Sequence, residues 1–445
     1  MTPDLLAPLD LAFWNIETDR HPMHLGALGV FAAPSPTAGA HAAELLAARA
    51  AGVPGLRMRI RDVWQPPGLR HPLAFGGAAR EADPDFDPLD HVRLHTPTAD
   101  FQAEAGRLME RPLRRGRPPW EAHVLPGDGG TGFAVLFKFH HALADGLRAL
   151  TLAAAVLDPM DLPVRRPRPE PPRRGPLPGL RALPGLVRDA LSDTGRALDI
   201  GASLAVSTLA ARPTPALTAE PSGTRRTAGV VVDIDEVHRV RKSVGGTVND
   251  VLIAVVAGAL RRWLDERGDG SDGVMPRALI PVSTRRPSTA HPPGNRLSGY
   301  LTRLPVNDPD PLGRLGTVRT AMDRNKEAGP GRGAGAVALL ADHVPPLAHR
   351  LAGPLAAQAA RLWFDILVTS VPLPGFCLRL GGSPLTAVHP YAPLARGQSL
   401  AIAMSTYRGS VHFGLVADAR AVPDLDRLAQ AVTDEVAALI EACER

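Results

Sequence analysis

The sequence predicts two α/β lobes joined by a long, proline-rich crossing. Strand-like and helical apolar segments recur on both sides of the middle of the chain, and a Pro/Arg-rich tract separates the two sets. A chain of 445 residues also exceeds the size at which a single hydrophobic core usually stops growing. We therefore expect a first lobe over residues 1–157, a linker with an amphipathic helix over residues 158–224, and a second lobe over residues 225–445.

The first lobe should contain a strand, an alanine-rich helix and a hairpin of two apolar strands. Gly52 and Pro54 follow the alanine-rich stretch and end the helix, because neither residue continues one well. A Pro-Gly-Asp-Gly-Gly string separates the two later apolar runs and is typical of a turn. In chain order, these elements are expected at residues 25–31, 40–51, 120–125 and 132–141.

The linker has a composition of its own. Residues 163–178 are rich in Pro and Arg, which excludes helix and sheet and predicts an extended crossing. Leucines and valines then recur at helical spacing among arginines over residues 180–198, which predicts an amphipathic helix. This helix either packs on the body of the protein or lies on a membrane surface. Residues 347–363 form a second amphipathic stretch. This stretch belongs either to the core or a tunnel wall, or to a membrane-binding surface.

The second lobe should again mix strands with helices. A long apolar run beginning at Asn249 predicts a buried helix, and an amphipathic pattern near the C-terminus predicts a closing helix. Strands are expected at residues 229–234, 278–282, 300–306, 364–371, 399–407 and 412–417, and helices at residues 249–264 and 424–443.

The charge and the cysteine content indicate which kinds of partner the protein binds and in which cellular compartment it works. The formal net charge is +5, which favours an anionic partner such as a phosphorylated cofactor or an acidic lipid surface. Aromatic residues make up only 4% and do not interleave with a basic stripe, so we expect no nucleic-acid partner. Two cysteines, an N-terminus without a basic signal region and an apolar run of only ten residues, 251–260, predict a cytoplasmic protein, free or peripheral at a membrane.

The strongest chemical signal is the string from Phe137 to Gly146, in which an apolar strand runs into two histidines. Side chains alternate along a strand, so His140 and His141 must point to opposite faces, with His141 continuing the face of Phe137 and Phe139. The two rings therefore cannot easily hold one metal ion, and no further ligand lies at a suitable spacing. We expect no metal.

Asp145 and Gly146 follow at the turn from strand to helix. Aspartate is a favoured N-cap, and glycine permits a tight backbone. Asp145 is therefore expected to shape the loop and not to transfer a proton. A generic His-His pair would more often belong to a core, but the complete string HHxxxDG at a strand end is much more specific.

Several further motifs accompany HHxxxDG in a fixed order. Each is weak alone, and the order and spacing together are specific. The motifs are Pro8-Leu9-Asp10, Pro22-Met23-His24-Leu25-Gly26, Asp85-Phe86-Asp87, His91-Val92, Arg117-Pro118-Pro119-Trp120-Glu121, Arg225-Arg226, Gly246-Thr247-Val248-Asn249-Asp250, Pro281-Val282-Ser283, Gly294-Asn295, Val371-Pro372 and Ser405-Thr406-Tyr407.

Through these motifs the chain resembles the CoA-dependent acyltransferase superfamily, and within it the bacterial wax ester synthase/diacylglycerol acyltransferase family. The resemblance implies two chloramphenicol-acetyltransferase-like lobes with an active-site channel between them. It also implies transfer of an acyl group from acyl-CoA, a co-substrate, to a hydrophobic alcohol or diacylglycerol without a permanently bound cofactor. In this family the second histidine is the general base, which points to His141, while His140 is structural.

The resemblance also suggests roles for residues outside the histidine motif. Asn249 or backbone N–H groups would stabilise the oxyanion, although Asn249 and Asp250 could equally cap a helix. Arg225 and Arg226 could contact CoA phosphates, pair with Asp145 or simply lie at the surface. The remaining candidates are Thr247, Asp250 and Ser283 on the CoA side, and Pro119, Trp120 and Phe139 along the channel, with Trp120 alternatively a core residue.

The chain departs from the family pattern in two motifs. The usual Pro-Leu-Trp becomes Pro118-Pro119-Trp120, and Ser-Asn-Val-Pro-Gly-Pro becomes the string over residues 369–374. These changes leave the acceptor alcohol and the acyl length open. Three functions stay in view: synthesis of a lipid ester at inner membranes or lipid droplets, acyl tailoring of a secondary metabolite from CoA or a carrier protein, and non-catalytic binding of acyl-CoA or lipid.

Overall fold

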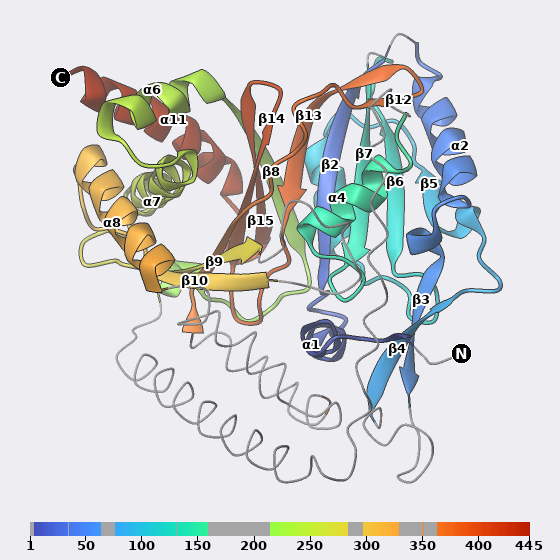
Figure 1. Cartoon of the computed structure of the whole chain (residues 1–445). Helices are drawn as coiled ribbons and strands as arrows, with labels where there is room; N and C mark the ends of the chain where they lie inside the picture. The colour runs from blue at the N-terminus through green and yellow to red at the C-terminus, as the bar shows by residue number, and fades with distance from the viewer. Residues whose placement is uncertain are drawn as a thin grey trace, which may run out of the picture.

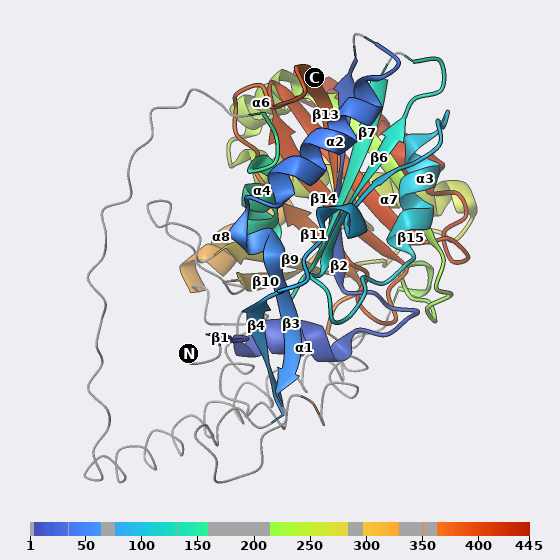
Figure 2. The ribbon, with the colours of Figure 1, turned by 90° about the vertical axis from the view of Figure 1, so that its right-hand side faces the viewer.

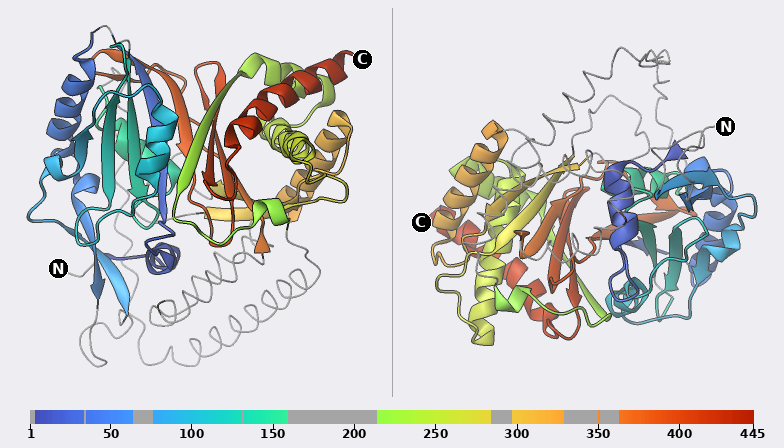
Figure 3. Two further views of the ribbon diagram at one scale, coloured as in Figure 1. Left: turned by 180° about the vertical axis from the view of Figure 1, so that it is seen from behind. Right: turned by 90° about the horizontal axis from the view of Figure 1, so that it is seen from below.

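Two lobes lie side by side, each built on a β-sheet with helices against it, as Figures 1 and 3 show. This arrangement confirms the predicted two-lobed α/β fold. The predicted Pro/Arg tract, the helix at residues 180–198 and most of the stretch 347–363 lie outside the described residues. The computed structural model describes residues 4–33, 35–63, 76–130, 132–158, 214–283, 297–328, 350 and 363–445.

Within the described part, the sheet of the first lobe has the strand order β12-β13-β2-β7-β6-β5. Helices α2 and α4 share one apolar core with one face of this sheet, and α3 packs on the other face. The predicted strand, helix and hairpin of this lobe are all confirmed. The bounds are β2 (His24–Ala32), α2 (Ala38–Ala50), β5 (Val92–Leu94), α3 (Phe101–Met109), β6 (Trp120–Pro126), β7 (Gly132–His140) and α4 (Gly146–Ala154).

The sheet of the second lobe has the order β10-β9-β11-β14-β15-β8 within the described residues. The predicted buried helix is α7, whose residues 251–260 are all buried in the core of this lobe. The bounds are β8 (Arg225–Asp233), α6 (Ile234–Val244), α7 (Val248–Arg267), β9 (Arg277–Ser283), β10 (Leu297–Arg303), α8 (Pro311–Ala328), β11 (Ile366–Ser370), β14 (Leu400–Tyr407), β15 (Ser410–Asp418) and α11 (Leu425–Glu444).

Two strands from the C-terminal part of the chain cross into the first lobe. Strand β13 (Ser383–Tyr391) pairs antiparallel with β2, and β12 (Arg379–Leu380) pairs with β13. The predicted division at residue 225 therefore needs one amendment, because the sheet of the first lobe is completed by residues 379–391. Sequence analysis missed this strand, since its partner lies more than 350 residues away and Pro384 and Pro390 interrupt the strand pattern.

Strand β13 also crosses β15 and β8 of the second lobe at very short range, at Gly414 and Gly229 respectively. A Cβ atom at Gly414 would lie 1.9 Å from the carbonyl oxygen of Pro390, and one at Gly229 would lie 2.6 Å from the ring of His389. Only glycine allows backbones to approach this closely. The two lobes are therefore joined through a closely packed strand crossing as well as through the covalent linker.

A small third sheet, absent from the sequence prediction, supports the end of the first lobe. It has the order β1-β4-β3 among the described residues and lies beside α1, as Figures 1 and 2 show. This unit contacts the loop that carries the histidine pair, since the ring of Phe13 in α1 stacks on that of His141. The bounds are β1 (Asp4–Leu5), α1 (Pro8–Ile16), β3 (Met58–Val63) and β4 (Gly77–Ala82).

Among the described residues, we find no single helix both long enough and apolar enough to cross a bilayer. Helices α6 and α7 together reach the required length and composition, but their axes are bent by 101° at the break between them.

Candidate active site

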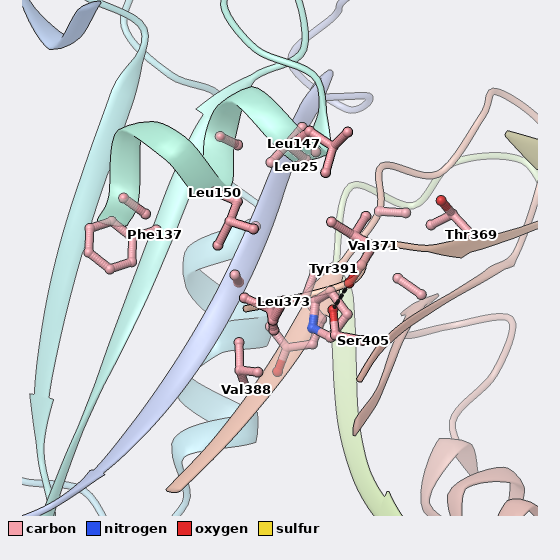
Figure 4. A pocket seen from close by; sticks show the side chains of 18 of the residues that line it. Leu25, Phe137, Leu147, Leu150, Thr369, Val371, Leu373, Val388, Tyr391 and Ser405 are labelled. Atoms are coloured by element: carbon pink, nitrogen blue, oxygen red, sulfur yellow. Dashed lines mark hydrogen bonds between the residues drawn. The ribbon is translucent and has the colours of Figure 1, made fainter. Parts of the chain in front are cut away.

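A cavity of about 520 Å³ lies between the two lobes. The first lobe contributes β2, the end of β7, α4 and β13, and the second lobe contributes the start of α7 and strands β9, β11 and β14. Figure 4 shows the apolar side chains that dominate one wall and the few hydroxyl groups on the opposite one. Representative lining residues are Leu25, Phe137, Leu150, Val388, Thr369 and Ser405.

His141 lies on the wall of this cavity. It follows the last residue of β7, and Phe137, Phe139 and His141 all line the cavity, so the predicted alternation of side chains is confirmed. The backbone N–H of His141 donates to the carbonyl oxygen of Met23 at 2.8 Å. Its ring stacks on Phe13, with ring centroids 4.1 Å apart and planes inclined by 21°. The imidazole is thus supported on one side and faces the cavity on another.

Burial also sets the protonation state of His141. Removal from water lowers the pKa of the imidazole below its usual 6.5, because a buried site disfavours the charged form. The negative charges of Asp145 and Asp10 act in the opposite direction without reversing the shift. The ring is therefore neutral at pH 7, which is the form that a general base requires.

His140 points away from the cavity, as predicted. Its Nδ1 accepts from the backbone N–H of Ala142 at 3.0 Å, and its Nε2 lies 3.3 Å from Oε1 of Glu17. The hydrogen bond and charge of His140 lower the pKa of the Glu17 carboxyl in spite of its burial. His140 is therefore placed to shape the turn after β7. In the described ranges, no three His, Cys, Asp or Glu side chains gather in a geometry for binding a metal ion.

Asp145 and Gly146 begin helix α4 on the cavity wall. Oδ1 of Asp145 accepts from the backbone N–H of Arg148 at 2.9 Å, which is the expected N-cap geometry. Gly146 was predicted to permit a tight backbone turn, but its φ is not positive, so its backbone conformation does not require glycine. A Cβ atom at Gly146 would lie 2.9 Å from Cγ2 of Val371, so glycine allows α4 to approach the second lobe.

The Thr-Val-Asn-Asp string divides into capping and cavity-facing residues. Oγ1 of Thr247 accepts from the N–H of Asp250 at 3.2 Å, and Oδ2 of Asp250 accepts from the N–H of Thr247 at 2.8 Å. This capping box starts α7. Asn249 lines the cavity instead, from the first turn of α7 in the second lobe. The capping pair is thus Thr247 with Asp250, and the predicted alternative of Asn249 with Asp250 is wrong for Asn249.

Of the three predicted channel residues, Phe139 alone lines the cavity. Trp120 is 2% exposed, donates from Nε1 to the carbonyl oxygen of Leu56 at 2.6 Å and stacks on His91. It belongs to the core, the alternative that the sequence left open. The carbonyl oxygen of Pro119 accepts from the N–H of His140 at 2.9 Å, so Pro119 supports the strand end from outside the cavity lining.

The two predicted phosphate-binding arginines lie away from the cavity lining. Arg225 is buried and lies 3.8 Å from the carboxylate of Asp418, its register partner on β15. Arg226 is half-exposed and pairs with Asp426 of α11. Both pair with these aspartates instead of Asp145, so that alternative is wrong. Ser283 ends β9, its side chain is outside the described part, and its neighbour Val282 lines the cavity.

Two contributions to the site were missed as site residues. Ser405 of β14 lines the cavity, and its Oγ donates to the carbonyl oxygen of Val371 at 2.7 Å, as Figure 4 shows. Strand β13 contributes Val388 and Tyr391. The sequence could have indicated Ser405, because this residue belongs to one of the ordered motifs. It could not have indicated β13, because prolines interrupt the strand pattern there.

Comparison with protein-family models gives two matches along the chain. The wax ester synthase/diacylglycerol acyltransferase catalytic domain matches residues 6–252. The C-terminal domain of the same family, WS/DGAT, matches residues 293–439. Together the two matches cover most of both lobes and include the HHxxxDG and Thr-Val-Asn-Asp strings, while Pro281-Val282-Ser283 lies between them.

Individual relatives agree with the family models. The probable diacylglycerol O-acyltransferase tgs2 of Mycobacterium tuberculosis is 34% identical over 96% of this chain and 96% of its own length. The probable diacylglycerol O-acyltransferase tgs1 of the same organism is 30% identical over 99% of this chain and 96% of its own. A solved structure, the wax ester synthase/diacylglycerol acyltransferase from Marinobacter aquaeolei VT8, superposes with a TM-score of 0.71 at 22% identity, covering 100% of both chains. At that identity the superposition establishes the shared fold.

Proposed function

Because this chain belongs to the wax ester synthase/diacylglycerol acyltransferase family, we propose that it esterifies a hydrophobic alcohol with a fatty acyl group from acyl-CoA, using His141 as general base. The chain is an O-acyltransferase by its family, with acyl-CoA and an alcohol or acylglycerol as the substrates that the family implies. The observation that carries the proposal is the position of His141 on the wall of an apolar cavity between the lobes.

The first step is attack of the alcohol on the thioester. A hydroxyl group is a poor nucleophile at neutral pH, so the neutral His141 imidazole removes its proton as the oxygen bonds to the thioester carbon. The carbonyl oxygen becomes an oxyanion, for which Asn249, on the part of the cavity wall formed by α7, is the proposed donor. The carbon–sulfur bond then breaks, the CoA thiolate takes the proton from His141, and the ester leaves. The step balances without an acyl-enzyme.

The cavity wall supports a fatty acyl group as the transferred unit. On one side, β2 and α4 present a continuous apolar surface, while hydroxyl and amide groups gather near the second lobe. An alkyl chain is stabilised by removal from water at roughly 0.8 kcal/mol per buried CH₂. We propose diacylglycerol as the first acceptor to test, since the relatives at 30–34% identity carry diacylglycerol O-acyltransferase names.

We further propose that the enzyme works in the cytoplasm at the inner membrane face or on lipid droplets. Its proposed acceptor is insoluble in water and must be met at a lipid surface. The arginine-rich composition and the net charge of +5 support attraction to such a surface where it is anionic.

Release of free CoA thiol from palmitoyl-CoA tests the proposed function. Purified protein is supplied with dipalmitoylglycerol, hexadecanol or no acceptor. We expect thiol release that depends on one of these acceptors, together with formation of the matching ester. An enzyme that tailors a secondary metabolite would release thiol with neither lipid, and a binding protein would retain palmitoyl-CoA without releasing thiol. Either result would overturn the proposal.

A further inference from the structure

One face of α1 and the residue after it contact both histidines. Asp10, Phe13, Trp14 and Glu17 are spaced three, four and seven residues from the first of them, which places them on one side of a helix. Phe13 stacks on His141, and Trp14 meets the ring of His140 edge-on at 5.1 Å. Glu17 contacts His140 through Oε1, which also accepts from the N–H of Met23 at 3.0 Å.

The fourth member of this face, Asp10, reaches the histidine loop through an arginine. Arg80 of β4 forms an ion pair with Asp10 and donates from the same nitrogen to the carbonyl oxygen of Ala142 at 3.1 Å. Asp10 is 0% exposed and Arg80 is 6% exposed. Ala142 directly follows His141, so a buried guanidinium joins the helix to the residue beside the proposed base.

Such a pair is a poor source of stability. The desolvation of two buried charges often outweighs their attraction, and replacement by apolar residues is frequently neutral or stabilising. The pair instead fixes the backbone. The N–H of His141 is bonded to Met23, and the next carbonyl, that of Ala142, is bonded to Arg80. The peptide segment that carries the imidazole is therefore anchored on both sides.

We propose that Asp10 and Arg80 are positioning residues for His141. This inference rests on the proposed function of His141, and neither residue touches the reacting atoms. Their bond to Ala142 holds the imidazole at the distance and angle that proton transfer needs, and a displacement of about 1 Å is enough to reduce a rate by roughly 100-fold. The expected signature is a fall in kcat, with little change in KM, because the walls of the acyl cavity are unaltered.

The test compares Asp10→Asn with a matched change in the second lobe. Glu435 pairs with Arg314, both side chains are 3% exposed, and the pair is remote from the cavity lining. Glu435→Gln therefore neutralises a carboxylate in an equally buried arginine pair. We expect Asp10→Asn to lower kcat by about 10- to 100-fold at a KM for palmitoyl-CoA within two-fold of the original. Glu435→Gln should lower thermal stability and leave kcat within two-fold.

Equal losses of kcat in the two variants, or a folded Asp10→Asn protein with the original kcat, would overturn the proposal. If Asp10→Asn does not fold, the double change Asp10→Leu with Arg80→Met removes both charges and keeps apolar volume in the core. The folded double variant should show the same fall in kcat, and full turnover would again overturn the proposal.

A second measurement separates this inference from the proposed function. The imidazole signal of His141 in histidine-labelled protein is identified by its loss in His141→Ala and is read by NMR without substrate. It should be single in the original protein and in Glu435→Gln, and broadened or doubled in Asp10→Asn. An unchanged signal would contradict the positioning role even if the original protein transfers no acyl group.

Discussion

The rings of Phe13 and His141 lie face to face, with centroids 4.1 Å apart, although the two residues are separated by almost the whole first lobe. The contact comes from α1, which packs beneath the loop that follows β7. Apolar packing on this side excludes water from one face of the imidazole, while its other side borders the cavity. The same burial lowers the pKa of His141 and keeps it neutral near pH 7.

The pH dependence of turnover follows from this shift. Because the neutral imidazole is the active form and its pKa is lowered below 6.5 by burial, the acidic limb of kcat/KM should have its midpoint below pH 6.5. The rate falls through this limb as the ring gains a proton. Rates of thiol release across pH 5–8 check this prediction. An acidic limb with its midpoint above 6.5 would show that burial does not set the protonation state of the base.

Stability should also decline in acid. His21 and His412 are buried, and burial lowers the pKa of each to about 4, against 6.5 in a solvated state. Between these values the unfolded chain binds more protons than the folded one, so the stability that is complete above pH 6.5 is lost as the pH falls toward 4. Urea unfolding at pH 7.5 and 5 should show a lower midpoint at pH 5. A smaller fall in the midpoint in His412→Phe than in the original would identify that ring as one source, and an equal fall would exclude it.

Asn249 should contribute to transition-state stabilisation. Loss of one oxyanion donor typically lowers kcat by about 10²–10³, and we expect Asn249→Ala to fall in that range with a small change in KM. Thr247→Ala is the matched control, because it removes a helix cap two residues away and should lower stability by about 1 kcal/mol. If both variants keep their turnover, the oxyanion is stabilised by other groups.

The cavity should set the length of the acyl chain. Gly29 lines the cavity, and a Cβ atom there would lie 2.9 Å from Cδ1 of Leu385. We expect Gly29→Val to reduce kcat/KM for palmitoyl-CoA by at least about 10-fold, since overpacking commonly costs 1–3 kcal/mol. Turnover of butyryl-CoA should be retained. Val30→Ile, on the opposite face of the same strand, is the control. Equal activity of the Gly29 variant on both chains would exclude this wall from acyl binding.

Local patterns account for what the sequence predicted well. The alternation along residues 132–141 is sufficient to divide His140 from His141, and the apolar run over residues 251–260 is sufficient to predict the buried helix α7. Each of these features involves contacts between residues close together in the chain. The predicted two-lobed fold followed from such elements together with the family resemblance.

Long-range contacts account for what was missed. Asp10 and Arg80 are 70 residues apart, and no local sequence pattern predicts that they form a buried ion pair. Arg225 was expected on a CoA phosphate, beside Asp145 or at the surface, yet the register of β8 with β15 places it beside Asp418. Strand β13 pairs with a strand at the other end of the chain. Such partners are brought together only when the sheet forms, so neither composition nor hydrophobic periodicity predicts them.

The central claim is that one imidazole, that of His141, removes the proton of the acceptor alcohol. The most direct measurement is the rate at which the His141→Ala variant releases CoA thiol in the presence of the acceptor. Circular dichroism and thermal unfolding verify that the variant is folded. The account predicts a loss of about 10²–10⁴ in kcat in a protein that still binds palmitoyl-CoA. A folded His141→Ala protein with near-original turnover would contradict it.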